Sequence, residues 1–71
     1  MQEVKLREED EFIKLGQLLK KVGLVSSGVE AKDVIVNGEV LVNKETEVRR
    51  GRKLYDGDEV TFMDETVRVI K

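Results

Sequence analysis

The stretch SGVEAKDVIVNGEVLVN, residues 27–43, decides the fold because its apolar spacing changes from helical to alternating at Gly38. It opens with a capping box, Ser27-Gly28-Val29-Glu30, in which the serine oxygen accepts a first-turn N–H and the glutamate reaches back to the serine N–H. A helix of about ten residues is therefore expected, ending at Asn37-Gly38, where both residues tolerate a positive φ. Its expected apolar face is Val29, Ala31, Val34 and Ile35.

Beyond Gly38 the apolar residues recur at every second position, which is the period of a strand. Val40 and Val42 begin this pattern, and Asn43-Lys44-Glu45 predicts the first turn. Asp56-Gly57 predicts a second turn, and Asp64-Glu65 predicts a third one. Three or four strands of a small sheet are therefore expected after the helix.

Upstream of this stretch, the sequence predicts a short strand and another helix. Residues 3–7, EVKLR, alternate apolar and charged side chains, and the acidic run at residues 8–11 suits the start of a helix. The helix is expected from Phe12 to Val22, with Gly23 ending it. Its apolar positions are Phe12, Leu15, Leu19 and Val22, with Ile13 and Leu18 beside them, and Lys14, Lys20 and Lys21 face solvent.

Together these elements predict an α+β fold in which two short N-terminal helices pack on a small antiparallel or mixed sheet. Residues 1–71 contain no linker, repeat or low-complexity tract, so we expect a single domain. Phe12 and Phe62 are expected to lie in its core, and Tyr55 at the edge of that core.

The composition argues against catalysis and against a metal or cofactor site. The chain has no cysteine and no histidine, so the commonest general base and the commonest zinc ligands are missing. Asp58 has no obvious partner that would shift its pKa, and Asp56-x-Asp58-Glu59 lacks the spacing of a calcium loop. We expect no enzyme, no small-molecule substrate, no metal and no cofactor.

No apolar run approaches the roughly 20 residues that a membrane helix needs, and the N-terminus MQEVKLREEDE is too acidic for a signal peptide. We therefore expect a soluble, cytoplasmic protein without a membrane partner, acting as a monomer. Charge is unevenly distributed in it. Residues 1–13, 14–53 and 54–71 carry net charges of −3, +4 and −3, so a basic centre lies between two acidic ends and is suited to a polyanion.

The basic centre is densest where four cations surround Gly51, at Arg49, Arg50, Arg52 and Lys53. Clustered cations neutralise phosphates and release counterions, so this loop predicts contact with a nucleic acid backbone. The alternative interpretation is a solvated loop that balances the nearby acids Asp56, Asp58 and Glu59.

Several motifs resemble, in order and spacing, the S-four-type RNA-binding domain, also called the alpha-L RNA-binding motif. They are Gly23-Leu24, Ser27, Glu30-Ala31 with Val34-Ile35, Gly38-x-Val40-x-Val42-Asn43 and Gly57-Asp58-x-Val60. The match covers about residues 12–62. The stretches Ser27-Gly28-Val29-Glu30-Ala31-Lys32 and Arg49-Arg50-Gly51-Arg52-Lys53-Leu54 look like those of small stand-alone bacterial members. The resemblance implies that the two helices and the loop after them hold structured RNA.

Two positions depart from the family pattern. Many members have arginine where this chain has Gly28, which removes one expected RNA contact, and many have glycine where it has Lys44, which adds a cation to the hairpin turn. Lys20 and Lys21 also suit the C-terminal end of a helix dipole, and Ser27 is chiefly a helix cap. The RNA-binding residues expected from charge and resemblance are Lys20, Lys21, Ser27, Lys32, Lys44, Arg49, Arg50, Arg52 and Lys53. For Tyr55, the alternative to a place at the edge of the core is stacking on an RNA base.

The function expected from the resemblance is non-catalytic binding of structured RNA, ribosomal RNA in particular, in ribosome assembly or translation. One alternative is a protein-interaction adaptor whose acidic ends contact a basic ribosomal protein. Another is a ubiquitin-like β-grasp sulfur carrier, since V-N-G-E and G-D-x-V also occur in such proteins. Carriers use a C-terminal Gly-Gly, whereas this sequence ends Val69-Ile70-Lys71, so we expect the sulfur-carrier interpretation to fail.

Overall fold

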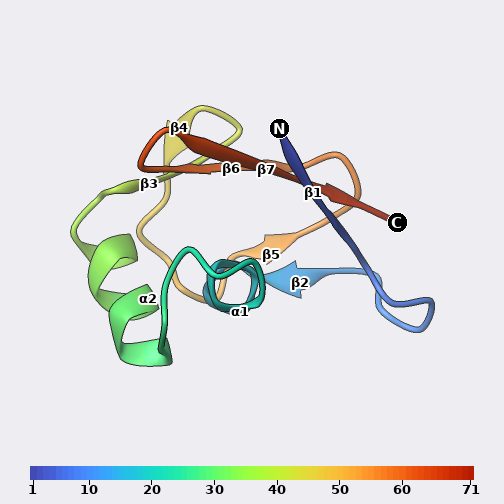
Figure 1. Ribbon diagram of the computed structural model, residues 1–71, viewed down its shortest axis with the longest axis horizontal. Helices are drawn as coiled ribbons and strands as arrows, with labels where there is room; N and C mark the ends of the chain where they lie inside the picture. Colours follow the sequence, from blue (N-terminus) through green and yellow to red (C-terminus); the bar gives the residue numbers. More distant parts are fainter.

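A five-stranded sheet forms one layer of the computed structural model, which describes residues 1–71 (Figure 1). The strand order is β1-β7-β6-β3-β4. β1 runs parallel to β7, and the other neighbours are antiparallel, so the sheet is mixed. Its strands are β1 (Gln2–Lys5), β3 (Val40–Val42), β4 (Glu45–Thr46), β6 (Glu59–Phe62) and β7 (Glu65–Ile70).

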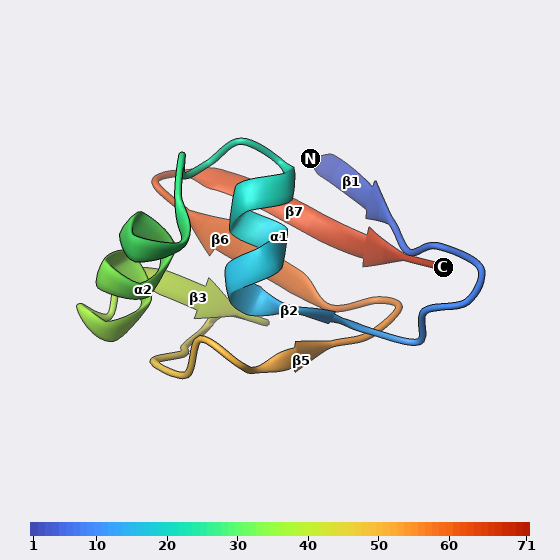
Figure 2. The same cartoon turned by 90° about the horizontal axis from the view of Figure 1, so that it is seen from below.

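Both helices and a second, two-stranded sheet lie on the same side of the main sheet and form the other layer (Figures 1 and 2). The elements of this layer are β2 (Ile13–Lys14), α1 (Leu15–Lys21), α2 (Gly28–Val36) and β5 (Lys53–Leu54). The expected α+β class, with two short helices on a mixed sheet, is therefore confirmed. The helices follow β1 and β2 instead of opening the chain. Neither helix is long and apolar enough to cross a membrane.

The core fills the space between the two layers. Alternate residues of the strands point into it, as the period of two requires; Val60 and Phe62 of β6 are buried while Glu59 and Thr61 are less so. The fifteen core residues are Val4, Leu6, Leu15, Leu18, Leu19, Val25, Ala31, Ile35, Val40, Val42, Leu54, Val60, Phe62, Val67 and Val69. Phe62 is thus in the core, as predicted.

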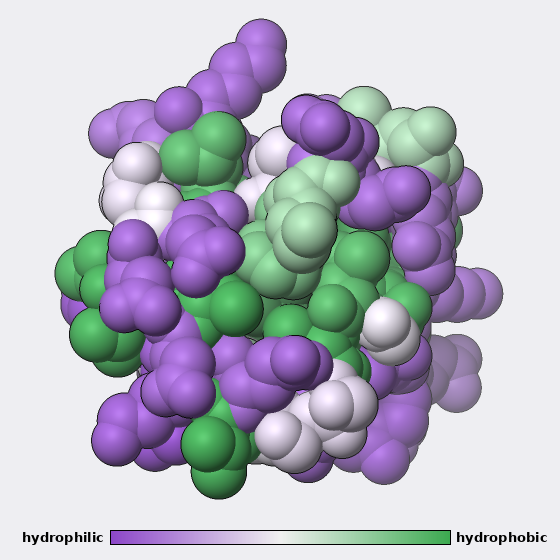
Figure 3. Space-filling view, turned by 60° about the vertical axis from the view of Figure 1, so that its left-hand side comes forward, coloured by the Kyte–Doolittle hydropathy of each residue, from purple (hydrophilic) through white to green (hydrophobic).

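Hydrophobic and hydrophilic side chains are interspersed on the face shown in Figure 3, as on most small proteins. The large apolar side chains that remain exposed over the whole chain are Met1, Val29, Val36, Val48, Tyr55 and Met63.

The prediction for the start of α1 was wrong. Ile13 and Lys14 form β2, paired antiparallel with Leu54 and Lys53, and the helix begins only at Leu15. The apolar spacing from Phe12 onward suited a helix, but pairing with a distant strand determines the backbone here. Phe12 is also outside the core; it is half-buried, with its ring centroid 5.9 Å from that of Tyr55.

The start of α2 agrees with the prediction except in two details. Ser27 Oγ accepts the N–H of Glu30 at 3.1 Å, so the serine cap is present. Glu30 Oε1 accepts the N–H of Ser26 at 2.6 Å, not that of Ser27. Val29 was placed on the apolar face but is 72% exposed, because it lies two residues, or about 200°, from buried Ala31 around a helix of 3.6 residues per turn.

Two tight hairpins connect the strands of the main sheet. Asn43 and Lys44 have φ of 51° and 72°, and Met63 and Asp64 have φ of 50° and 67°. Two consecutive positive φ values are typical of the turn that matches the twist of a two-residue hairpin. The first turn lies where it was predicted. The third lies one residue earlier than predicted, because Glu65 already belongs to β7.

Candidate functional site

The residues Arg49 to Lys53, here called the basic loop, are held against the start of α1 by backbone contacts. The N–H of Leu15 donates to the Arg52 carbonyl at 2.9 Å, and the N–H of Gly16 donates to the Arg50 carbonyl at 3.1 Å. A Cβ at Gly16 would lie 2.9 Å from Arg50 Cγ, so only glycine allows this approach without displacement. The loop therefore satisfies otherwise unpaired N–H groups of α1 and takes its position from that helix.

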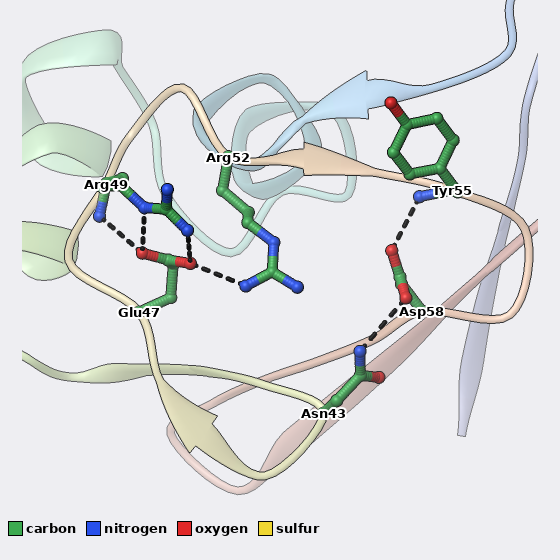
Figure 4. Close-up of polar contacts among 6 residues, drawn as sticks. All are labelled: Asn43, Glu47, Arg49, Arg52, Tyr55 and Asp58. Carbon is green, nitrogen blue, oxygen red and sulfur yellow. Dashed lines mark hydrogen bonds and ion pairs between the residues drawn. The ribbon is translucent and has the colours of Figure 1, made fainter.

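A buried carboxylate holds two of the four cations of the basic loop. Glu47 is only 6% exposed. Arg49 donates to it from Nε at 3.1 Å, from Nη2 at 3.2 Å and from its backbone N–H at 3.0 Å. Arg52 Nη1 donates at 2.7 Å (Figure 4). We call this arrangement the Glu47 clamp.

The Glu47 clamp changes the pKa of Glu47 and of Arg49. Hydrogen bonds from Arg49, and next from Arg52, stabilise the carboxylate and lower the pKa of Glu47 from 4.5 to about 2, although burial opposes the change. The same contacts raise the pKa of Arg49. Glu47 and Arg49 are therefore both charged near neutral pH, and Arg49 and Arg52 already have an anionic partner within the protein.

A groove of about 340 Å³ is lined by residues of the basic loop, of β2 and of both helices, and we call it the basic groove. Three cations line it: Lys14 from β2, Lys20 from α1 and Arg50 from the loop. None of these three forms an ion pair, and no carboxylate lines the groove. The lining residues are Lys14, Gly16, Gln17, Lys20, Gly28, Ala31, Arg50 and Gly51.

A second hollow continues the positive surface on the other side of Gly51. Arg49, Gly51, Arg52 and Lys53 line it, so Gly51 belongs to both hollows. Because Gly51 has no side chain and a Cβ there would meet no atom within 4 Å, its backbone is open to a ligand. The two hollows share Gly51, and their cations together suit a chain of anionic groups.

The structure brings some of the predicted RNA-binding residues together and leaves others apart. Lys20 and all four cations of the basic loop line the two hollows. Lys32 is exposed on α2, one helical turn beyond Gly28 at the groove. Lys21 lines an adjoining hollow with Glu9, Asp10 and Glu11, and Lys14 and Lys20 line that hollow as well as the basic groove. Lys44 lies in the β3–β4 turn and lines neither hollow.

Three charged or polar side chains of the site were not among those predicted: Lys14, Gln17 and Glu47. Lys14 was missed because it was assigned to the solvent face of a longer helix. Gln17 lines the groove and accepts the Lys14 N–H at 3.2 Å. The signal for Glu47 was its spacing, since an acid two and five residues before Arg49 and Arg52 is positioned to pair with both.

The acids after the basic loop do not balance its charge. Asp58 accepts the Asn43 side-chain N–H at 3.1 Å and the Tyr55 backbone N–H at 2.8 Å (Figure 4). Asp56 accepts the Lys71 backbone N–H at 3.0 Å. The partner of the loop arginines is Glu47, so the alternative of a loop balanced by Asp56, Asp58 and Glu59 named the wrong acids.

The cap of α2 provides a prediction that separates stability from binding. Replacing Ser27 by alanine removes the hydrogen bond to the Glu30 N–H and should lower the free energy of unfolding by about 1 kcal/mol. We expect nucleic acid affinity to change less than about threefold well below the melting temperature, since no charge is lost. Urea unfolding followed by circular dichroism measures the first effect. A large loss of affinity in the folded variant would instead assign a direct contact to the Ser27 hydroxyl.

Comparisons with known proteins agree on the family. The family model described as "S4 domain" matches residues 4–70. "Probable ribosome maturation protein RlbA" of Bacillus subtilis (strain 168) is 52% identical over 52 residues, which cover 73% of each chain. "Putative RNA-binding protein YbcJ" of Escherichia coli (strain K12) is 36% identical over 58 residues, covering 82% of this chain and 83% of that one.

A solved structure is also similar. The solution structure of YbcJ from E. coli, described as revealing an alfaL motif involved in RNA-binding, has a TM-score of 0.73 and 32% identity to this chain. The similarity covers all of this chain and 89% of YbcJ. The resemblance to the alpha-L motif found in the sequence is therefore confirmed.

Proposed function

This chain belongs to the S4 domain family, and from that premise we propose that it is a non-catalytic RNA-binding protein that holds structured RNA in its basic groove. The observation that carries the proposal is the set of three unpaired cations, Lys14, Lys20 and Arg50, around a groove without a carboxylate. Cations left without a partner inside the protein remain available to phosphates.

The geometry of the site suits binding through the RNA backbone. The three cations of the groove come from three different elements, so their charges lie at separate points. Such an arrangement suits several successive phosphates better than one isolated anion. Gly51 lets the RNA backbone approach the loop closely. Contacts of this kind fix the position of an RNA without reading its sequence, and double-stranded RNA is recognised mainly through its shape and backbone.

We further propose that the bound RNA is ribosomal and that the protein acts in ribosome maturation. Support comes from the B. subtilis relative, which is named a probable ribosome maturation protein and is 52% identical over 73% of this chain. The protein would then stabilise one RNA conformation during assembly, alone or beside ribosomal proteins, without making or breaking covalent bonds.

The first test of RNA binding is its dependence on salt. If roughly four to six phosphates are engaged, log affinity should fall against log salt with a slope of about −3 to −5. The measurement is fluorescence anisotropy of a labelled ribosomal RNA hairpin over salt concentrations from about 50 to 300 mM. Absence of binding at the lowest salt, or a flat salt response, would overturn the proposed function.

Crosslinking identifies the RNA itself. Ultraviolet crosslinking in cells, followed by sequencing of the bound fragments, should give a dominant footprint on one region of ribosomal RNA. A footprint spread over messenger RNAs would support a regulator of translation instead of a maturation protein, while leaving RNA binding intact.

A further inference from the structure

The β2–β5 sheet has one face in the core and one face toward solvent. Ile13 pairs with Leu54, and Lys14 pairs with Lys53. Leu54 is fully buried and Ile13 packs against the core, whereas both lysines are exposed. Side chains alternate across a strand, so the residue before Ile13 and the residue after Leu54 face outward, on the same side as the two lysines.

The flanking residues on this outward face are Phe12 and Tyr55. Their rings lie 5.9 Å apart, centroid to centroid, with an angle of 52° between the planes. Lys53 Nζ lies 4.9 Å from the centroid of the Phe12 ring, so this cation contacts one aromatic face. Two of the three aromatic residues of the chain therefore meet on the surface, beside two lysines.

Tyr55 is held in a fixed position while its ring stays accessible. Asp58 accepts the Tyr55 backbone N–H at 2.8 Å, and the ring points away from that carboxylate (Figure 4). Tyr55 remains 48% exposed, outside the core cluster. Phe12 packs against the ring from one side, which restricts its motion without covering it.

The aromatic pair adjoins the surface that we assign to RNA phosphates. Lys14 stands on the outward face of β2 and also lines the basic groove. Lys53 contacts the Phe12 ring and also lines the hollow beside Gly51. An RNA strand held by these lysines would therefore pass next to the Tyr55 ring.

We propose that Tyr55, supported by Phe12, is a stacking platform for one unpaired nucleobase of the bound RNA. This inference rests on the proposed function, since the phosphates in the groove bring the base to the ring. Aromatic rings beside cations bind unpaired bases in many RNA-binding proteins, whereas bases within a duplex are already stacked on each other. The preferred ligand is thus a helix interrupted by an unpaired nucleotide, whatever the identity of its base.

Two RNA hairpins test the proposal: a continuous stem, and the same stem with one unpaired nucleotide in its middle. We expect the wild-type protein to bind the interrupted stem at least about tenfold more tightly. Tyr55→Leu should lose this preference while keeping the salt slope, because no cation is removed. Tyr55→Phe should retain the preference. Met63→Ala, which removes an exposed apolar side chain from the β6–β7 turn, is the control and should also retain it.

A base analogue reports stacking directly. With 2-aminopurine as the unpaired nucleotide, its fluorescence should change on binding to the wild-type protein and change much less on binding to Tyr55→Leu. Equal, salt-dependent binding of both hairpins by the wild type, or a preference that survives in folded Tyr55→Leu, would overturn the stacking platform alone. Failure of the wild type to bind either hairpin would overturn both the stacking platform and the proposed function.

Discussion

Replacing Lys14, Lys20 and Arg50 together by glutamine is expected to lower RNA affinity by about 100- to 1000-fold at about 50 mM salt. The three side chains line the basic groove and have no anionic partner in the protein. Loss of up to three phosphate contacts should also make the salt slope shallower by roughly two to three units. Glutamine preserves long polar side chains, so the fold should survive. Anisotropy titrations with a ribosomal RNA hairpin over a salt series measure both quantities.

The matched control removes the same charges from elsewhere. Lys5, Arg68 and Lys71 are exposed and do not line the groove. Their replacement by glutamine changes the net charge equally, again through two lysines and one arginine. We expect this variant to lose less than about fivefold in affinity and to keep its salt slope, because only long-range attraction is reduced. Equal losses in the two variants would show that general charge, and not the groove, accounts for binding.

Replacing Glu47 by glutamine should produce the largest change in stability among the charged residues. The pKa of Glu47 falls from 4.5 to about 2 on folding, which corresponds to about 3 kcal/mol. Screening at the exposed Arg49 reduces this to about 2 kcal/mol. The melting temperature should therefore fall by about 10 °C for a domain of this size. Thermal unfolding followed by circular dichroism measures the change, and Glu45→Gln, at an exposed position of β4, is the control.

The effect of Glu47 has a defined pH dependence. A carboxylate whose pKa is lowered on folding contributes stability above its unfolded pKa, and this contribution is lost as the pH falls through the folded value. The difference in unfolding free energy between the wild type and Glu47→Gln should therefore be constant above about pH 5 and shrink between about pH 4.5 and 2. A difference that stays constant over that range would show that the Glu47 clamp does not stabilise the fold.

The main elements of the fold could be predicted from local sequence. The serine cap and Glu30 marked the start of α2, and the alternation from Val40 onward marked the sheet. Local spacing failed at Phe12 and Ile13, because both a helix and a strand can pack Ile13 against the core. Pairing of β2 with β5, forty residues away, decided between them. No local signal carries such a contact.

The candidate site could be predicted only in part for a related reason. The basic loop and Lys20 were identified by charge and now line two adjoining hollows. The spacing of Glu47 before Arg49 and Arg52 was a local signal for their pairing, but sequence could not show that Lys14 joins Arg50 across the groove. That second fact depends on how the basic loop docks on α1. The RNA contacts themselves stay predictions for every residue.

Nuclear magnetic resonance with a ribosomal RNA hairpin tests most directly whether the basic groove is the binding surface. Amide nitrogen–proton spectra of the free and the bound protein give one signal for each backbone N–H. The largest shifts should occur at Gly16, Gly28 and Gly51, which line the groove from three elements. Strand β1 and the turn at Met63 should remain unchanged. Shifts concentrated on β1 and that turn, with the three glycine signals unmoved, would contradict the groove as the RNA-binding site.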